Sequence, residues 1–174
     1  MARQIVVAAY SGDAGATRIE AAAAFVRELS KLCGDAALLL GGYRGLMRVV
    51  ADEALRRGLR VVFVIPREYE GDEFPERSIV VRTGLGPRER SSVLVRSGEA
   101  LAVLGGGVGT LFEVLLACSY GIPVLQLVMS NGRLLTDRFA ECISDGVVDE
   151  RLGCRVRYVF SGEELARKLC SGQG

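Results

Sequence analysis

The sequence predicts an α/β protein in which one open parallel sheet is covered by helices on both faces. Three observations predict this class. Short and almost wholly apolar runs alternate with segments of helical periodicity along the chain. Glycine-rich turns follow three of those apolar runs. No linker or repeat divides residues 1–174, and this length buries a sizeable core without disulfides or metals, so we expect a single domain.

The first half of the chain runs through strand, glycine turn and helix twice. Its strands are nearly all apolar, as expected for a parallel sheet that is buried on both faces. Thr17 and Glu20 predict a capping box at the start of the first helix. The predicted elements are, in order, strand 4–10, helix 17–33, strand 36–40 and helix 46–57.

The second half continues the alternation after one irregular segment. Residues 66–76 are charged and contain two prolines, so we expect a surface excursion there. Pro87 is well placed to start a short helix, and Ser161 with Glu164 predicts the cap of the last helix. The predicted elements are strands 61–65 and 78–82, helix 87–97, strand 100–104, helix 110–120, strand 124–128, helix 136–144, strand 156–160 and a helix ending at 169.

This order of elements is typical of Rossmann-like sheets. In that architecture the turns that follow the strands all open on one edge of the sheet, where ligands bind. We therefore expect the turns at 11–15, 41–45 and 105–109 to line one crevice.

Composition narrows the class of partner. A net charge of +1 with 49% hydrophobic residues excludes disorder and gives no electrostatic footprint for nucleic acid or a membrane surface. No apolar run approaches the roughly 20 residues of a membrane span, and no signal-peptide pattern is present, so we expect a cytoplasmic protein with a small-molecule partner. Histidine is absent, which excludes zinc sites with histidine ligands, Ser-His-Asp triads and Cys-His nucleophiles. We assign no metal and no cofactor.

The cysteines and the cations give weaker indications. Arginine far outnumbers lysine, present only as Lys31 and Lys168, and side-chain amides are sparse, which favours a thermophilic or GC-rich source. The cysteines are odd in number and contain no C-x-x-C pair, so we interpret most of them as buried small hydrophobes. They are Cys33, Cys118, Cys142, Cys154 and Cys170.

The most informative segment is the glycine loop GGGVGTLFE at residues 105–113. It lacks the G-K-[ST] ending of a P-loop, and it fits the dinucleotide fingerprint only if Thr110 replaces the last glycine. Amide groups at a helix N-terminus suit a single phosphate, which we assign to Gly106, Gly107, Gly109 and the Thr110 hydroxyl. The alternative is a tight turn that needs no ligand, with Thr110 as N-cap and Glu113 completing a capping box.

Glu113 is the only charged residue between Glu99 and Arg133, on an otherwise apolar helix, so we expect it to be partly desolvated and paired with a cation. Arg90 is the candidate partner because it shares the inward stripe of the helix that begins at Pro87. Arg88 and Arg96 lie off that stripe and are expected in solvent. The alternative for Arg90 is a surface arginine whose stem packs down.

Three segments resemble the Lonely Guy (LOG) family, the "lysine decarboxylase-like" Rossmann-like proteins in a wider group that includes DprA. GGGVGTLFE resembles the family's P-G-G-x-G-T-x-x-E, GGYRGLM at 41–47 resembles G-G-x-x-G-L-M-G, and Arg90 stands at the arginine of R-K-x-x-M. Gly105, Ser91, Leu94 and Arg48 depart from the family's proline, lysine, methionine and glycine. These departures place the chain in a divergent branch similar to molybdenum cofactor carrier proteins.

The resemblance implies a phosphoribohydrolase that releases the base from a nucleoside 5′-monophosphate, with Arg90 and Glu113 as catalytic pair. It also implies a homodimer or higher homo-oligomer. We expect an AMP-like ligand bordered by Gly42, Gly45 and Met47, with Ser11 and Gly12 on the opposite wall. The alternatives are a non-catalytic carrier of a phosphorylated pterin such as the molybdenum cofactor, a nucleotide-sensing module, or a structural domain with an empty crevice.

Overall fold

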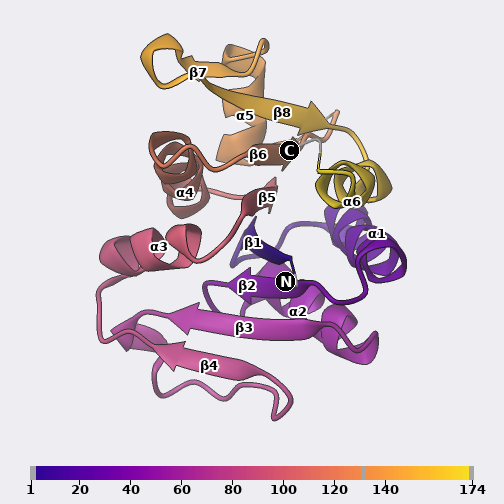
Figure 1. The fold of residues 1–174 in the computed structure, drawn as a ribbon, viewed down its shortest axis with the longest axis vertical. Coiled ribbons are helices and arrows are strands. Elements are labelled where there is room, and N and C mark those ends of the chain that lie inside the picture. Colours follow the sequence, from indigo (N-terminus) through magenta and orange to yellow (C-terminus); the bar gives the residue numbers. More distant parts are fainter. Residues whose placement is uncertain (1–2, 131, 173–174) are drawn as a thin grey trace.

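Eight strands form one sheet in the computed structural model, which describes residues 3–130 and 132–172 (Figure 1). The strand order is β4-β3-β2-β1-β5-β6-β8-β7, and every neighbouring pair is parallel except β7 with β8. The strands are β1 (Gln4–Ala9), β2 (Ala37–Leu40), β3 (Arg60–Ile65), β4 (Ile79–Arg82), β5 (Ala100–Gly105), β6 (Val124–Leu127), β7 (Val147–Asp149) and β8 (Cys154–Val159).

Helices cover both faces of the sheet. Helices α1, α2 and α6 pack on one face, around a core that includes Phe25, Leu29 and Phe63. Helices α3 and α4 pack on the other face, and Figure 1 shows them on the opposite side of the strands from α1 and α6. The helices are α1 (Ala16–Leu32), α2 (Gly45–Arg56), α3 (Pro87–Arg96), α4 (Val108–Ser119), α5 (Leu135–Cys142) and α6 (Gly162–Cys170), with short 3₁₀ turns η1 (Arg67–Tyr69) and η2 (Glu150–Leu152).

The predicted fold class is confirmed. The chain leaves β1 in one direction towards β2 and returns through α3 to β5 on the other side of β1, so the direction of winding reverses between β1 and β5. Loops at such a switch point separate and leave a crevice at the carboxyl ends of the strands. The turn after β1 and the glycine loop after β5 meet at this point.

One local prediction is wrong, one strand was not predicted, and one helix cap is confirmed. Helix α1 begins at Ala16 with Gly15 as N-cap and no side-chain cap, so Thr17 and Glu20 do not form the predicted box. The short antiparallel strand β7 lacks a long apolar run and was not predicted. The cap of α6 is confirmed, because the Glu164 amide donates to the Ser161 hydroxyl at 3.1 Å.

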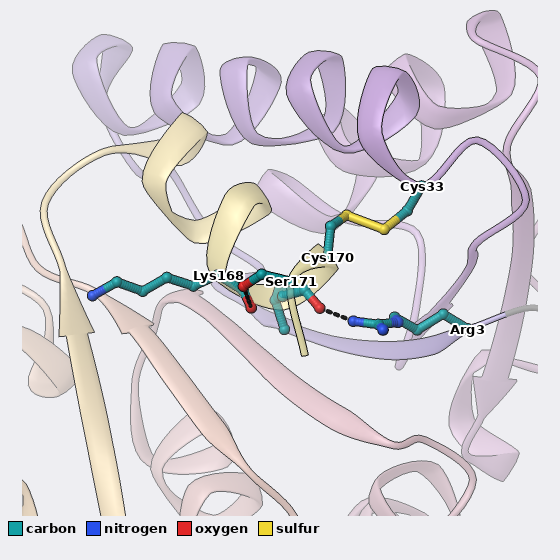
Figure 2. The surroundings of a disulfide bond; sticks show 6 residues. Arg3, Cys33, Lys168, Cys170 and Ser171 are labelled. Atoms are coloured by element: carbon teal, nitrogen blue, oxygen red, sulfur yellow. Dashed lines mark hydrogen bonds between the residues drawn. A yellow bond between two sulfur atoms is a disulfide. The ribbon is translucent and has the colours of Figure 1, made fainter. Parts of the chain in front are cut away.

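The interpretation of the cysteines as separate apolar residues is also wrong. Cys33 at the end of α1 is joined to Cys170 at the end of α6, 137 residues away, and Figure 2 shows this bond beside Arg3, which donates to the carbonyl of Leu169. Cys118 is joined to Cys154, and Cys142 is free and exposed. Spacing along the chain cannot reveal these pairs, because they depend on α1 packing beside α6 and on α4 packing beside β8.

Across the described residues, no helix combines the length and apolar character needed to cross a membrane.

Candidate functional site

A cavity of about 320 Å³ lies at the carboxyl ends of β1 and β2, between α3 and the start of α4. We call it the crevice cavity. Its walls come from five segments that are distant in the sequence, and the fold brings them together at the switch point. The residues that line it include Val7, Ala9, Tyr10, Ser11, Gly41, Met47, Tyr69, Arg88, Arg90, Gly107, Val108, Gly109, Thr110 and Glu113.

Arg90 and Glu113 face each other in the wall of this cavity. Their exposed fractions are 8% and 7%, and Nη1 of Arg90 lies 3.4 Å from Oε1 of Glu113. The alternative of a surface Arg90 is therefore wrong. The pair has a single long contact rather than the two short bonds of a bidentate pair. Within the described part of the chain, the buried Nε of Arg90 has no hydrogen-bond partner.

Ser91 is a third member of this group. Its hydroxyl lies 3.0 Å from Oε1 of Glu113 and 3.1 Å from the carbonyl oxygen of Pro87. A hydroxyl has one proton to donate, so it can bond strongly to only one of these oxygens at a time. Ser91 stands at the position where the family resemblance has a lysine, so this departure lies within the site.

Burial is the largest influence on the pKa values of both members of the pair. It raises the pKa of Glu113, while the charge of Arg90 and the hydrogen bond from Ser91 act in the opposite direction. Burial lowers the pKa of Arg90, which the charge of Glu113 opposes. A buried carboxyl group with a raised pKa is a candidate for proton exchange during a reaction.

The glycine loop is not the ligand-free capping box that was the alternative prediction. Helix α4 begins at Val108 with Gly107 as N-cap, so Thr110 is already the third helical residue and no side-chain cap is present. Gly105 has a φ of +109°, which proline cannot adopt because its ring holds φ near −65°. This conformation explains why glycine replaces the family's proline at this position.

The backbone amides of the glycine loop differ in whether they have acceptors within the protein. The amide of Gly106 donates to the hydroxyl of Thr136 at 2.9 Å, so this amide already has an acceptor within the protein. Gly107 and Gly109 line the cavity, together with Val108 and Thr110, at the first turn of α4. That turn carries amides without partners inside the helix and a partial positive charge, which suits an anion.

Arg88 adds a positive charge beside that turn. Its guanidinium is exposed, as predicted, but it lines the cavity and lies 5.7 Å from the ring centroid of Phe112 on α4. The sequence pattern did not indicate this role, because Arg88 lies off the buried stripe of α3. A cation near the amino-terminal turn of α3 was the available signal.

The other predicted residues divide between the wall and the layer behind it. Ser11 and Met47 line the crevice cavity, whereas Gly12, Gly42 and Gly45 do not. Gly45 packs against the backbone of Ser11, with no room for a side chain. Gly41 lines the cavity instead of Gly42, and any side chain on it would collide with the guanidinium of Arg90.

Tyr10 and Tyr69 also line the cavity, and no sequence pattern predicted either of them as a site residue. Tyr69 belongs to η1, inside the segment predicted as a surface excursion. The guanidinium of Arg44 lies 4.4 Å from its ring centroid and is held by Asp72 at 2.8 Å. The excursion thus returns an aromatic ring to the cavity, an arrangement that no local pattern indicates.

The sequence also matches the model of a known protein family. The sequence model of the SLOG cluster4 family matches residues 3–150. The chain belongs to the SLOG cluster4 family. An uncharacterized protein from Archaeoglobus fulgidus is 34% identical over 91 residues, a match that covers 52% of this chain and 58% of that relative.

Solved structures place this SLOG protein near two kinds of neighbour. TM1055, a structural genomics target, is 28% identical, with a TM-score of 0.82 and coverage of 95% of this chain and 96% of that one. The molybdenum cofactor binding protein of Rippkaea orientalis is 23% identical, with a TM-score of 0.76 and coverage of 99% and 98%. The molybdenum cofactor carrier protein of Chlamydomonas reinhardtii is 21% identical, with a TM-score of 0.74 and coverage of 98% and 99%.

At these identities, the two molybdenum cofactor proteins show a shared fold. The family match and the neighbours together confirm the recognition made from the motifs, a divergent LOG-like branch close to molybdenum cofactor carriers.

Proposed function

We propose that this SLOG protein binds a nucleoside 5′-monophosphate in the crevice cavity and hydrolyses its N-glycosidic bond. The observation that carries the proposal is the buried, incompletely bonded Arg90–Glu113 pair, which opens into the same cavity as the first turn of α4. The cavity therefore combines a helix start that suits a phosphate with a carboxyl group that can stabilise a cation.

The phosphate binds over the first turn of α4. Gly107, Gly109 and the Thr110 hydroxyl contact it, and Arg88 supplies an opposite charge from α3. Met47 and Ser11 border the sugar and base, and the half-buried Tyr69 ring offers the base a surface for stacking.

Cleavage of a glycosidic bond passes through a transition state with positive charge on the sugar ring. Glu113 stabilises that charge and accepts a proton from the attacking water, whose oxygen bonds to C1′ of the sugar. The bonding electrons leave with the base, which takes a proton from solvent. Arg90 holds the carboxylate ionised and in place until the proton is transferred.

A direct assay tests this proposal. AMP is incubated with the protein, and free adenine and ribose 5-phosphate are separated by chromatography. Glu113→Gln should lower the rate by at least about 10²-fold, the usual contribution of a positioned acid–base group. The matched control is Glu99→Gln, which changes an exposed carboxylate in the connection between α3 and β5. Equal rates for the wild type and Glu113→Gln would contradict the assignment.

The second candidate function is that of a carrier for a phosphorylated pterin. Two structural neighbours that are named for the molybdenum cofactor favour it, with TM-scores of 0.76 and 0.74. The same phosphate contacts can bind a nucleotide or a phosphorylated pterin, because they do not involve the organic part of the ligand. Saturable binding followed by recovery of the intact ligand would support this function over hydrolysis.

We also propose that the protein forms a homodimer through the outer face of α4. Leu115 on that face has an exposed fraction of 42%, so its aliphatic side chain is accessible to a second copy of the chain. Light scattering should give twice the mass of the chain for the wild type, and Leu115→Glu should shift it towards the monomer.

A further inference from the structure

We propose that Thr136 is a positioning residue for the phosphate. It does not line the crevice cavity, and it acts through hydrogen bonds that hold the glycine loop from behind. The inference rests on the phosphate binding proposed above and adds a residue that does not touch the ligand. Thr136 lies in the first turn of α5 and is completely buried.

Thr136 forms two hydrogen bonds with the backbone of Gly106. The amide of Gly106 donates to Oγ1 of Thr136 at 2.9 Å, and the amide of Thr136 donates to the carbonyl of Gly106 at 3.2 Å. Both polar groups of the Gly106 backbone are therefore occupied. Since Gly106 directly precedes the N-cap of α4, this bond pair decides where the helix starts and which way its first amides point.

Thr136 is itself held from behind. Its carbonyl accepts a hydrogen bond from Nε2 of Gln126 at 2.7 Å, and Gln126 is completely buried on β6. In the part of the chain that the structure describes, Oε1 of Gln126 has no partner. A buried side-chain amide with an unpaired oxygen destabilises the folded state. The presence of Gln126 at this position therefore indicates that its hydrogen bond to Thr136 is important.

A buried ion pair fixes the same turn of α5 to the end of β5. Nη2 of Arg18 donates to both carboxylate oxygens of Asp137 at 2.7 Å, and Nη1 donates to the carbonyl of Leu104 at 2.8 Å. Asp137 also accepts from the amide of Leu134 at 3.1 Å. The residues before and within the glycine loop are thus tied to neighbouring residues of α5, and we call this set the loop clamp: Arg18, Gln126, Thr136 and Asp137.

The loop clamp fixes the orientation of the peptide groups in the glycine loop. Apolar packing holds a helix on a sheet but does not choose the direction of a peptide group, whereas hydrogen bonds with buried partners do. The clamp turns the Gly106 amide away from the cavity and leaves the following amides to face it. A phosphate needs those amides directed at it before it arrives, because orienting them afterwards reduces affinity.

Substitution of the hydroxyl tests this role. Thr136→Val keeps the shape of the side chain and leaves the Gly106 amide buried without an acceptor, whereas Thr136→Ser keeps the acceptor. Binding of AMP and of adenosine is measured by calorimetry for each variant. We expect Thr136→Val to weaken AMP binding by about tenfold, the cost of a lost buried bond of this kind. Adenosine, which has no phosphate, should bind as it does to the wild type, and Thr136→Ser should bind AMP like the wild type.

The outcomes separate this inference from the proposed function. An equal loss for AMP and adenosine, or no loss for either, would overturn the positioning role while AMP binding by the wild type stands. Failure of the wild type to bind AMP would overturn the proposed function and the inference with it. If Thr136→Val does not fold, Gln126→Met removes only the outer bond and should weaken AMP two- to threefold, again without affecting adenosine; an unchanged affinity for AMP would contradict the proposal.

Discussion

Two buried arginine–carboxylate pairs flank the glycine loop, and they differ in how completely they are bonded. On the side of α1 and α5, Arg18 and Asp137 form two bonds of 2.7 Å and have further backbone partners. On the side of α3 and α4, Arg90 reaches Glu113 with one contact of 3.4 Å, and within the described residues its Nε is unpartnered. Both pairs are almost completely buried, so burial alone does not explain the difference.

The difference indicates a division of labour. Charges that stay buried need hydrogen bonds that satisfy them, and the clamp supplies these within the protein. The pair in the crevice cavity lacks them, and incompletely satisfied charged groups in a cavity are typical of functional sites. We infer that the first pair stabilises the fold and that the second pair completes its bonding with a ligand.

The largest expected effect is a difference between the two arginine–carboxylate pairs in their contribution to the free energy of unfolding. Asp137→Ala leaves the Arg18 charge buried without a counterion, and we expect the free energy of unfolding to fall by about 3–5 kcal/mol. Glu113→Ala should cost much less, because its partner gains access to water through the cavity. Urea denaturation of both variants measures the contrast. Comparable losses would remove the distinction on which the division of labour rests.

An intermediate effect concerns the ligand side alone. Tyr69→Ala should weaken AMP binding about tenfold, since stacking of a base on an aromatic ring contributes about 1–3 kcal/mol. Ribose 5-phosphate lacks the base and should bind unchanged, and Tyr69→Phe should retain the affinity for AMP. Calorimetry with both ligands checks this. A matched loss for ribose 5-phosphate would mean that Tyr69 supports the cavity wall rather than the base.

The smallest effect concerns proton affinity. The groups that act on Glu113 are Arg90, Arg88 and the Ser91 hydroxyl, and all three lower its pKa against the effect of burial. Ser91→Ala removes one stabilising contact from the ionised form, so the pKa of Glu113 should rise further. The acid limb of the kcat/KM profile for AMP hydrolysis should then move to higher pH by the same amount. A limb that stays in place would show that Ser91 donates to Pro87 instead.

Much of the fold could be predicted because its signals are local. The alternation of apolar runs with helical stripes is confirmed by the order of strands and helices, and the stripe of α3 correctly turns Arg90 inward. The single charge of α4 likewise directs attention to Glu113. These predictions depend on periodicity over one helix or strand, and packing of a parallel sheet preserves that periodicity.

The sequence by itself thus determined the Rossmann-like sheet, the crevice at its edge and the carboxylate within it. The tertiary structure alone decided which distant residues interact. Thr136 is hydrogen-bonded to Gly106, Ser91 is hydrogen-bonded to Glu113, and Cys33 forms a disulfide with Cys170. The return of Tyr69 to the cavity was decided in the same way. The physical reason is range, because residue patterns reflect interactions within one element. A hydrogen bond or disulfide depends on where distant elements come to lie, and only the packed sheet establishes those positions.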